Sequence, residues 1–501
     1  MKHTIILYSL LLLLLLLACS CERWIDVKPS DRVSERMLFE SRDGFLKALN
    51  GVYTGLSNRA IYGRFTLGPL ELMGQYFKGN GNFNGAYSQY RYTANDVTLA
   101  AFSNYWKQAY YLIVNCNIII DQCGDENPLL PAPWHGIVKG EALALRAFLH
   151  LDLLRLYGPV YSTDKEQESI PYVTNSNLEV SPVKKAREVM ELLLADLNEA
   201  ARLLEESDPI FENGVANSSA ADGDNSLRYR QYRMNYYAVK ALLARALLYS
   251  GNKTAAFDHA TAIINEVQQP GNELFPFVAI AAATNTAEPD RVFSTEVMFA
   301  AYDRHIEAEV FDPLFLPLLP ANDFLTFPFQ NHNTLYTGRL SELYADNSDI
   351  RYRTWWGVYT KIDGSDKFNY FRKYEKVATG AASDKFRAMI PLVRLSEMFL
   401  IAAECDPSLE EADRWLNALR EKRACSTLLL SASETERMTN VAAEFRREFL
   451  GEGQMFYFYK RLAEVIQTIP DASQYQAGRT ITMLPHQYVV PIPESETEQR
   501  N

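Results

Sequence analysis

Three stretches of the sequence combine flat aromatic rings with amide, hydroxyl and guanidinium side chains. They run from Gln75 to Tyr92, from Asp323 to Tyr336 and from Tyr352 to Tyr359. A sugar ring presents an apolar C–H face and a rim of hydroxyls, so a carbohydrate site needs aromatic platforms beside polar partners. The pattern therefore predicts carbohydrate binding. The candidate ligand-binding residues are Tyr76, Phe77, Asn82, Phe83, Tyr87, Tyr90, Arg91, Tyr92, Phe327, Phe329, Tyr336, Trp355 and Trp356.

Packing is the competing role for these rings, because aromatic side chains also hold long loops against a scaffold. Aromatic residues make up 12% of the chain, which is enough to serve both purposes. Four further rings recur at helical spacing before an apolar run, and we expect them in the core. These are Tyr105, Trp106, Tyr110 and Tyr111.

The sequence gives little support for a metal site, a phosphate-binding loop or a catalytic site. The seven histidines include no pair at zinc-ligand spacing and no HExxH, so we expect no metal. The glycine-rich segment 79–85 lacks the Lys-Ser/Thr of a phosphate loop, and no GxSxG elbow occurs. Carboxylates such as Glu404 and Asp406 could serve a glycosidase, but helix caps and ion pairs are their commoner role. We expect no catalytic residues and no cofactor.

The charge balance bears on the partners. The chain of 501 residues has 62 acidic and 50 basic residues, a net charge of −12. Nucleic-acid binding needs a basic surface, so nucleic acid is not an expected partner. With 48% hydrophobic residues the chain is too apolar to be disordered.

The N-terminus has the features of a secretory signal. Lys2 precedes an apolar run from Ile5 to Ala18, which is too short to span a bilayer but suits a signal peptide. Cys19 and Cys21 each follow a small residue, as in the bacterial lipobox. We predict a lipoprotein signal peptide over residues 1–20, cleaved before Cys19 or Cys21, one of which is acylated. A plain signal peptide with incidental cysteines is the alternative.

Helical periodicity dominates the rest of the chain, so we expect helices to position the loops. Small residues in two helix–turn–helix segments stand at spacings that resemble tetratricopeptide repeats. We predict a mainly α fold, a tetratricopeptide-like helical repeat scaffold with long irregular loop excursions between residues 270 and 385. The remaining cysteines, Cys116, Cys123, Cys405 and Cys425, are predicted to be buried, with one disulfide at most. The expected helices cover Glu141–Tyr157, a segment opening at Ser181-Pro182, Asn235–Ser250, Thr254–Val267, Leu392–Cys405 and Leu409–Arg420.

Eight short motifs occur in a fixed order along the chain, and together they resemble the SusD/RagB family of Bacteroidetes surface lipoproteins. The spacing of the first favours Cys21 over Cys19 as the lipidated residue. Met455 and Phe458 stand where the common pattern of the family has Arg and Asp. This difference bears on the subfamily rather than on the function. The motifs are Cys21–Pro29, Glu141–Gly158, Asp196–Leu197 with Ala200, Ala241–Arg245, Arg394–Glu397 with Ala403–Glu404, Asn417–Arg420, Arg446–Phe449 and Val490–Pro493.

The resemblance implies a single SusD-like domain over residues 21–501, with an N-terminal part of about 21–220 and a C-terminal part of about 270–501. It implies an extracellular-facing lipoprotein of the outer membrane that captures glycans and passes them to a SusC-like TonB-dependent transporter. It carries over no catalytic or ligand-contacting residue. A peptide receptor of the same fold, a helical-repeat scaffold that binds only protein, and a surface glycoside hydrolase are the alternatives.

Overall fold

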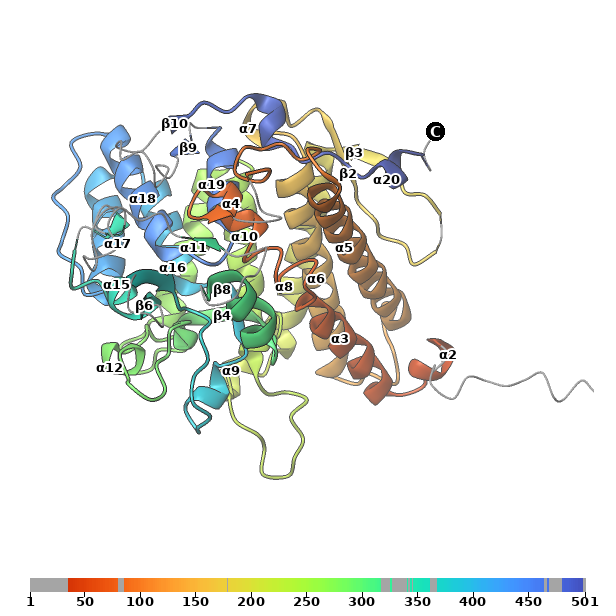
Figure 1. Cartoon of the computed structure of the whole chain (residues 1–501). Coiled ribbons are helices and arrows are strands. Elements are labelled where there is room, and N and C mark those ends of the chain that lie inside the picture. The colour runs from red at the N-terminus through yellow and green to blue at the C-terminus, as the bar shows by residue number, and fades with distance from the viewer. Residues whose placement is uncertain are drawn as a thin grey trace, which may run out of the picture.

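Long helices that each pack on the next one form the centre of the computed structural model (Figure 1). The structure describes residues 35–79, 85–177, 179–316, 325–326, 340, 343–344, 346–360, 367–463, 466–467 and 480–498. The long helices are α3 (Arg42–Leu56), α5 (Asp96–Cys123), α6 (Trp134–Tyr157), α8 (Ala186–Ser207), α10 (Tyr236–Tyr249), α11 (Lys253–Val267), α16 (Leu395–Cys405), α17 (Leu409–Lys422) and α18 (Glu434–Glu448). The series α5, α6, α8, α10, α11, α16 and α17 packs in chain order, as in helical repeats. The predicted mainly α, tetratricopeptide-like fold is confirmed.

Short helices and two-stranded pairings fill the connections between the long helices. The short helices are α2 (Glu35–Leu38), α4 (Pro69–Met73), α7 (Tyr161–Asp164), α9 (Ile210–Asn213), α12 (Ile280–Ala283), α13 (Asp312–Phe315), α15 (Ile350–Trp355), α19 (Met455–Leu462) and α20 (Glu494–Glu498), with single turns η2 (Arg230–Tyr232) and η5 (Ser383–Lys385). The antiparallel pairs are β1 (Lys78–Gly79) with β5 (Leu325–Thr326), β2 (Glu168–Pro171) with β3 (Val183–Lys185), β4 (Val297–Tyr302) with β8 (Met389–Arg394), β6 (Trp356–Thr360) with β7 (Lys367–Phe371), and β9 (Ile466–Gln467) with β10 (Thr480–Ile481).

Local capping explains most helix boundaries. The Asn95 side chain accepts a hydrogen bond from the Thr98 amide at 2.9 Å, and Asn235 caps α10 in the same way. The predicted helix start at Ser181-Pro182 is wrong, because residues 183–185 are extended and pair with β2, so that α8 begins at Ala186. The predicted helix from Leu392 likewise begins later, since the residues up to Arg394 belong to β8.

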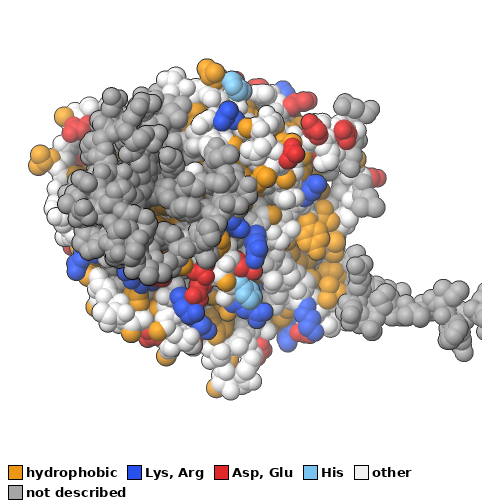
Figure 2. All heavy atoms as spheres, in the orientation of Figure 1, with side chains coloured by type: hydrophobic (Ala, Val, Ile, Leu, Met, Phe, Trp, Pro, Cys, Tyr) orange, Lys and Arg blue, Asp and Glu red, His pale blue; other side chains and the backbone are white. Residues whose placement is uncertain are grey.

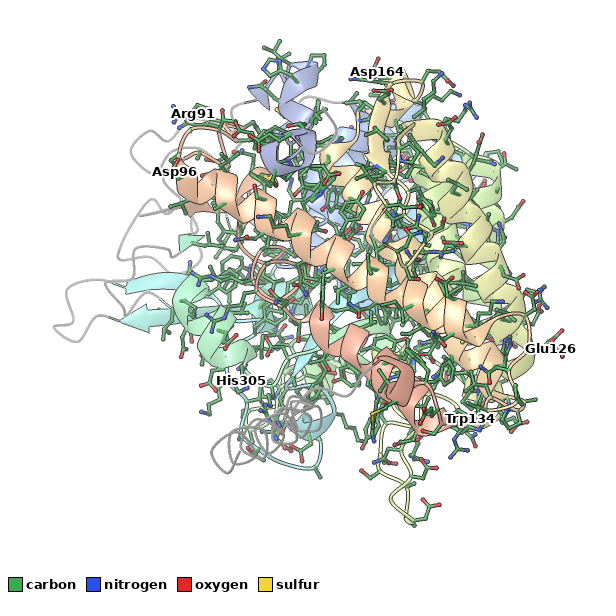
Figure 3. All side chains as sticks on the ribbon, turned by 90° about the vertical axis from the view of Figure 1, so that its right-hand side faces the viewer. Arg91, Asp96, Glu126, Trp134, Asp164 and His305 are labelled. Carbon is green, nitrogen blue, oxygen red and sulfur yellow. The ribbon has the colours of Figure 1, made fainter. Side chains whose placement is uncertain are left out.

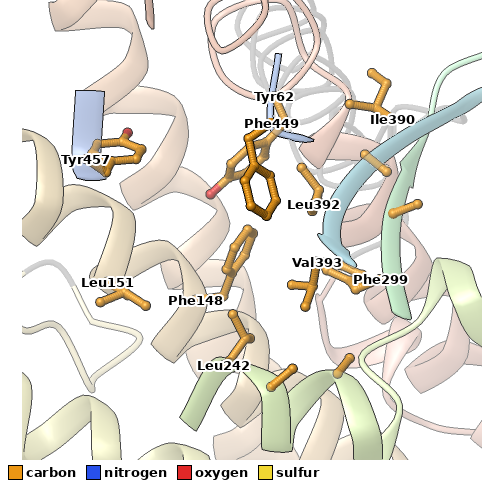
Figure 4. Close-up of a cluster of buried hydrophobic side chains, with 14 of the residues drawn as sticks. Tyr62, Phe148, Leu151, Leu242, Phe299, Ile390, Leu392, Val393, Phe449 and Tyr457 are labelled. Atoms are coloured by element: carbon orange, nitrogen blue, oxygen red, sulfur yellow. The ribbon is translucent and has the colours of Figure 1, made fainter. Parts of the chain in front are cut away.

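The core centres on α6, in which every residue from Gly140 to Tyr157 is buried. A helix that is buried all round belongs in the middle of a large core. Phe148 of α6 stacks on Tyr62 at a ring-centroid distance of 5.1 Å and meets Phe299 of β4 edge-on at 5.8 Å (Figure 4). This packing anchors β4 against the helical series.

Four cysteines fall within the described residues, and all four are free thiols. Cys116 and Cys123 are buried as predicted, whereas Cys405 and Cys425 are half-buried. The predicted signal peptide, with Cys19 and Cys21, lies outside the described residues. Among the helices that the structure describes, none has the length and apolar character needed to cross a bilayer.

Candidate functional site

The three aromatic stretches of the sequence are neighbours in the fold, two of them through a buried ring cluster and the second through a strand pairing. β1 in the first stretch pairs with β5 in the second, with Lys78 opposite Thr326. The ring of Phe77 lies 5.9 Å from that of Phe371 in β7, and Trp356 in the third stretch lies 5.5 Å from the same ring. The structure thus brings the described parts of the three predicted stretches next to one another.

Most of the predicted stacking rings are buried and present no open face to a ligand. The hydroxyl of Tyr76 donates to the carbonyl of Arg446 at 2.7 Å, and Trp355 Nε1 donates to the carbonyl of Arg291 at 2.6 Å. Burial of so much aromatic surface stabilises the loops against the scaffold. The predicted stacking role is therefore corrected to packing for Tyr76, Phe77, Tyr87, Tyr90, Tyr92, Trp355 and Trp356, each at most 5% exposed.

The other predicted residues have different positions. Arg91 is exposed beside the start of α5 (Figure 3) and lines a hollow of about 810 Å³ with Pro159 and Pro485. Tyr90 and Tyr92 reach this hollow, but their rings are buried, so it offers a guanidinium without an open platform. Outside the described residues lie Asn82, Phe83, Phe327, Phe329 and Tyr336.

A different hollow joins an exposed ring to several polar partners, and we call it the tyrosine groove. It has a volume of about 710 Å³ and lies between α3, the 214–229 loop at the bottom of Figure 1, the end of β4, and η5. This volume is in the range of small-molecule sites, about 300–1,000 Å³. Its lining includes the polar and aromatic side chains of Tyr53, Asn217, Asn225, Arg228, Tyr232, Arg233, Tyr302 and Lys385.

Tyr302 supplies the open ring of the groove. It is the last residue of β4 and is 55% exposed, whereas the other residues of that strand are buried. Tyr232 meets it edge-on, with ring centroids 5.5 Å apart and planes at 82°. The Tyr232 hydroxyl donates to the carbonyl of Lys385 at 3.1 Å, which fixes the supporting ring. Tyr302 is thus supported by a fixed neighbouring ring and keeps more than half of its surface exposed.

The floor of the groove is built from Tyr53 and Arg233. The Tyr53 hydroxyl donates to Glu141 Oε2 at 2.6 Å, and Arg233 Nε donates to the same oxygen at 3.1 Å. The Arg233 guanidinium also lies 4.2 Å from the centre of the Tyr53 ring. Burial would raise the pKa of Glu141, but the Arg233 and Arg230 guanidiniums outweigh it and hold that pKa below its ordinary value. The floor is therefore preorganised by a buried charge.

The wall formed by the 214–229 loop offers hydrogen-bonding groups. Asn217 Oδ1 is buried and has no hydrogen-bond partner among the described residues, although the residue lines the groove. Arg228 Nη2 donates to Ser218 Oγ at 2.8 Å, which orders the loop. Asn225 and Arg228, which also line the groove, carry amide and guanidinium groups of the kind that pair with ligand hydroxyls. Within the part of the chain that the structure describes, no acidic, histidine and cysteine side chains gather as a metal site.

The sequence pattern did not predict this groove, and it wrongly predicted that one tyrosine of α5 is buried. The segment 213–233 mixes Asn, Ser, Gly, Arg and Tyr, as the stretch 75–92 does, and this composition could have indicated it. Tyr105 and Trp106 are buried as predicted, and Tyr110 is half-buried. Tyr111 was predicted in the core but is 63% exposed, because its position on α5 faces away from α6 and the core.

Two family models match this chain over separate segments. A family model described as "Starch-binding associating with outer membrane" matches residues 23–229, and one described as "SusD family" matches residues 352–500. The "SusD-like protein P38" of Formosa agariphila is 27% identical over 190 residues, which are 37% of this chain and 34% of that protein. The match thus spans about a third of this curated relative.

Solved structures share the fold over nearly the whole chain. A SusD superfamily protein from Bacteroides thetaiotaomicron aligns with a TM-score of 0.68 at 20% identity, covering 91% of this chain and 98% of the other. Surface glycan-binding protein A from Bacteroides uniformis aligns with a TM-score of 0.66 at 18% identity, covering 92% and 98%. At these identities the likeness establishes the fold.

Proposed function

Because this chain belongs to the SusD/RagB family, we propose that it is a cell-surface glycan-binding protein that hands captured oligosaccharides to a SusC-like TonB-dependent transporter. Proteins of this family bind without catalysis. The family description names starch binding and outer-membrane association, and one structural neighbour is named for surface glycan binding. These names support a glycan as the ligand class.

The tyrosine groove is the proposed glycan site, and the observation that carries it is the exposure of the Tyr302 ring at the end of a buried strand. An exposed phenol ring that is supported by a neighbouring ring can stack against the C–H face of a sugar. The side chains of Asn217, Asn225 and Lys385, which line the same groove, carry amide and ammonium groups that can pair with hydroxyls. The volume of about 710 Å³ accommodates a short oligosaccharide segment.

The charges of the groove favour a neutral glycan. Arg233 is paired with Glu141 at 3.1 Å, and Asp384 is paired with Arg387 at 3.0 Å. On the face shown in Figure 2, acidic side chains gather at the upper right and basic side chains are more numerous in the lower half, among white and hydrophobic ones. The other charged side chains of the lining, Arg228 and Lys385 against Asp224, leave an excess of one cation, which is too small to select strongly for a charged polymer over a neutral one.

The proposed location follows from the N-terminal sequence. Acylation of Cys21, or of Cys19, would tether the folded part to the outer membrane with its groove facing outward. The described fold begins at Glu35, so at least 13 residues separate Cys21 from the first helix. A tether of this length permits the fold to lie beside a transporter in the same membrane.

Calorimetric titration tests the proposal. The chain from Glu22 to Asn501 is titrated with neutral polysaccharides, their oligosaccharides and a panel of peptides. We expect saturable binding of a glycan without shortened products, with Tyr302→Ala weakening it about tenfold, which corresponds to about 1.4 kcal/mol. Tyr302→Phe keeps the ring and should bind like the unaltered chain.

Tyr111→Ala is the matched control, because Tyr111 is a comparably exposed tyrosine on α5, outside the tyrosine groove. Unchanged affinity in this variant supports the groove. Binding of peptides alone, or release of shortened sugars, would contradict the proposed function. Glycan binding that survives Tyr302→Ala but fails in Tyr111→Ala would move the site to a separate hollow of about 630 Å³, which Tyr111 lines together with Arg59 and Lys107.

A further inference from the structure

One wall of the tyrosine groove is a loop whose tip stands clear of the rest of the molecule. The loop runs from Ala216 to Tyr229, and Figure 1 shows it projecting from the bottom of the fold. Within the described residues, segment 218–226 makes no hydrogen bond or ion pair with any residue outside the loop. A Cβ atom added at Gly223 would meet no atom within 4 Å. Few contacts therefore fix the position of the tip relative to the groove.

Hydrogen bonds inside the loop let it move as a unit. Near the tip, the Ala220 amide donates to Asn225 Oδ1 at 2.9 Å. Near the ends of the loop, Arg228 Nη2 donates to Ser218 Oγ at 2.8 Å. These bonds cross from one side of the loop to the other, so they preserve its shape when its ends rotate.

Both ends of the loop have a strained backbone. Ala216 has a φ of +49° and Tyr229 has a φ of +54°, in the left-handed region that residues with a Cβ atom rarely adopt. Two contacts with the body hold the loop in this conformation: Asn217 Nδ2 donates to Gln231 Oε1, and Leu227 packs on the core. The strain of two such residues is of the same order as the net gain from a hydrogen bond. A conformation that relaxes both φ angles is therefore close in free energy to the present one.

Opposite charges face the groove from its two sides. Asp224 lines the groove from the tip of the loop, and Lys385 lines it from η5. Neither side chain forms an ion pair with another described residue. Asp384, the neighbour of Lys385, is already paired with Arg387 at 3.0 Å. Movement of the tip across the groove would bring two unpaired opposite charges together.

We propose that the loop 216–229 is a flap that rotates about its two strained ends, closes over the tyrosine groove and is latched by an ion pair between Asp224 and Lys385. Rotation relaxes both positive φ angles, and the latch replaces the contacts that hold the loop in its present position. Asn225 moves toward Tyr302, so a sugar stacked on that ring is enclosed. The enclosure of a glycan rests on the proposed function, whereas the movement itself does not.

Disulfide trapping tests the movement without any ligand. Asp224→Cys and Lys385→Cys are combined in the chain from Glu22 to Asn501, and a disulfide forms only if the two Cα atoms come within about 7 Å. We expect mild oxidation to link the two positions, as detected by mass spectrometry of the peptides. Asp222→Cys with Lys385→Cys is the control pair, because Asp222 belongs to the same tip but does not line the groove. This pair should remain largely reduced.

Ala216→Gly tests the strained end of the flap. Glycine adopts a positive φ without steric cost, so this variant stabilises the present conformation relative to the closed one. The rate at which the 224–385 cysteine pair is linked should fall about fivefold. Ala221→Gly is the matched control, because it makes the same change in the same loop at a residue without a positive φ. It should leave the rate unchanged.

The outcomes separate the flap from the proposed function. A 224–385 pair that stays reduced, or one that links in Ala216→Gly as fast as in the parent, would overturn the flap. Oxidation of the pair with an oligosaccharide bound should slow release of the sugar, and unchanged release would overturn its enclosure. Trapping in a chain that binds no glycan would support the flap and contradict the proposed function. Glycan binding without trapping would do the reverse.

Discussion

Arg146 of α6 and Asp196 of α8 form a bidentate ion pair in which both contacts, Nε to Oδ2 and Nη2 to Oδ1, are 2.7 Å long. The remaining Nη1 donates to Asn117 of α5 at 2.9 Å. One guanidinium thus joins three successive helices of the series. The two charged side chains are 8% and 12% exposed, so water screens the pair only weakly.

Replacing Asp196 by Asn should destabilise the fold strongly. The variant keeps the shape but leaves the Arg146 charge without its counterion, and breaking a buried pair costs about 3–5 kcal/mol. The measurement is the free energy of unfolding in urea. Glu199→Gln on the same helix is the control, because Glu199 pairs with Arg202 in water, where such pairs contribute about 0–1 kcal/mol. Equal losses in the two variants would contradict the assignment.

Buried ion pairs between distant segments also join several of the eight short motifs that together identify the family. Arg245 pairs with Glu397, which is 152 positions away, and both belong to motifs. Arg394 and Glu448, from two further motifs, are fully buried together. Periodicity predicted the helices that carry these residues because it is a local property. The partners could not be predicted in the same way, since they depend on which helix packs on which.

The candidate site shows the limit of sequence reasoning most clearly. Residue type indicated that Tyr87 and Trp355 could stack on a sugar, but it could not indicate that packing would cover their faces. Tyr302 has the same side chain as Tyr87, and it is exposed because β4 ends there. Composition thus predicts the kind of chemistry, whereas exposure is decided by the tertiary contacts of each ring.

His150 should make the stability depend on pH. His150 Nδ1 lies 2.9 Å from the Arg146 carbonyl, and the amide of Val173 donates to Nε2 at 3.1 Å. Burial lowers the pKa of His150 to about 3, below its ordinary value of 6.5. The unfolded chain therefore takes up a proton as the pH falls through 6.5, while the folded chain does not. The contribution of uncharged His150 to the free energy of unfolding is therefore complete above pH 6.5. Between pH 6.5 and pH 3 it is lost at about 1.4 kcal/mol per pH unit.

Urea unfolding between pH 4.5 and 7.5 checks this expectation. His150→Gln removes the titrating group, so its free energy of unfolding should fall less steeply on acidification than that of the unaltered chain. The comparison uses the slope, because the variant also changes the hydrogen bonds and hence the absolute stability. Parallel pH profiles for the two proteins would contradict the role of His150.

The lipid anchor is tested at Cys19 and Cys21. If Cys21 carries the lipid, Cys21→Ala should abolish incorporation of a labelled fatty acid. It should also release the protein from the membrane fraction, because the acyl chains on this cysteine are the proposed membrane anchor. Cys19→Ala should then remain labelled. The double variant should show neither labelling nor surface display. Unchanged display of the double variant would remove the lipoprotein proposal.

The support that Tyr232 gives to Tyr302 leads to the last prediction. Tyr232→Ala removes the ring that holds Tyr302 edge-on at 5.5 Å, so the platform loses its fixed orientation. An aromatic pair contributes about 0.5–1.5 kcal/mol, and glycan affinity in calorimetry should fall about 2–12-fold. Tyr232→Phe keeps the ring and loses only the hydrogen bond to the Lys385 carbonyl, so its affinity should stay near that of the unaltered chain. A large loss in Tyr232→Phe would mean that the hydroxyl acts directly on the ligand, and the edge-on support would not then be the cause.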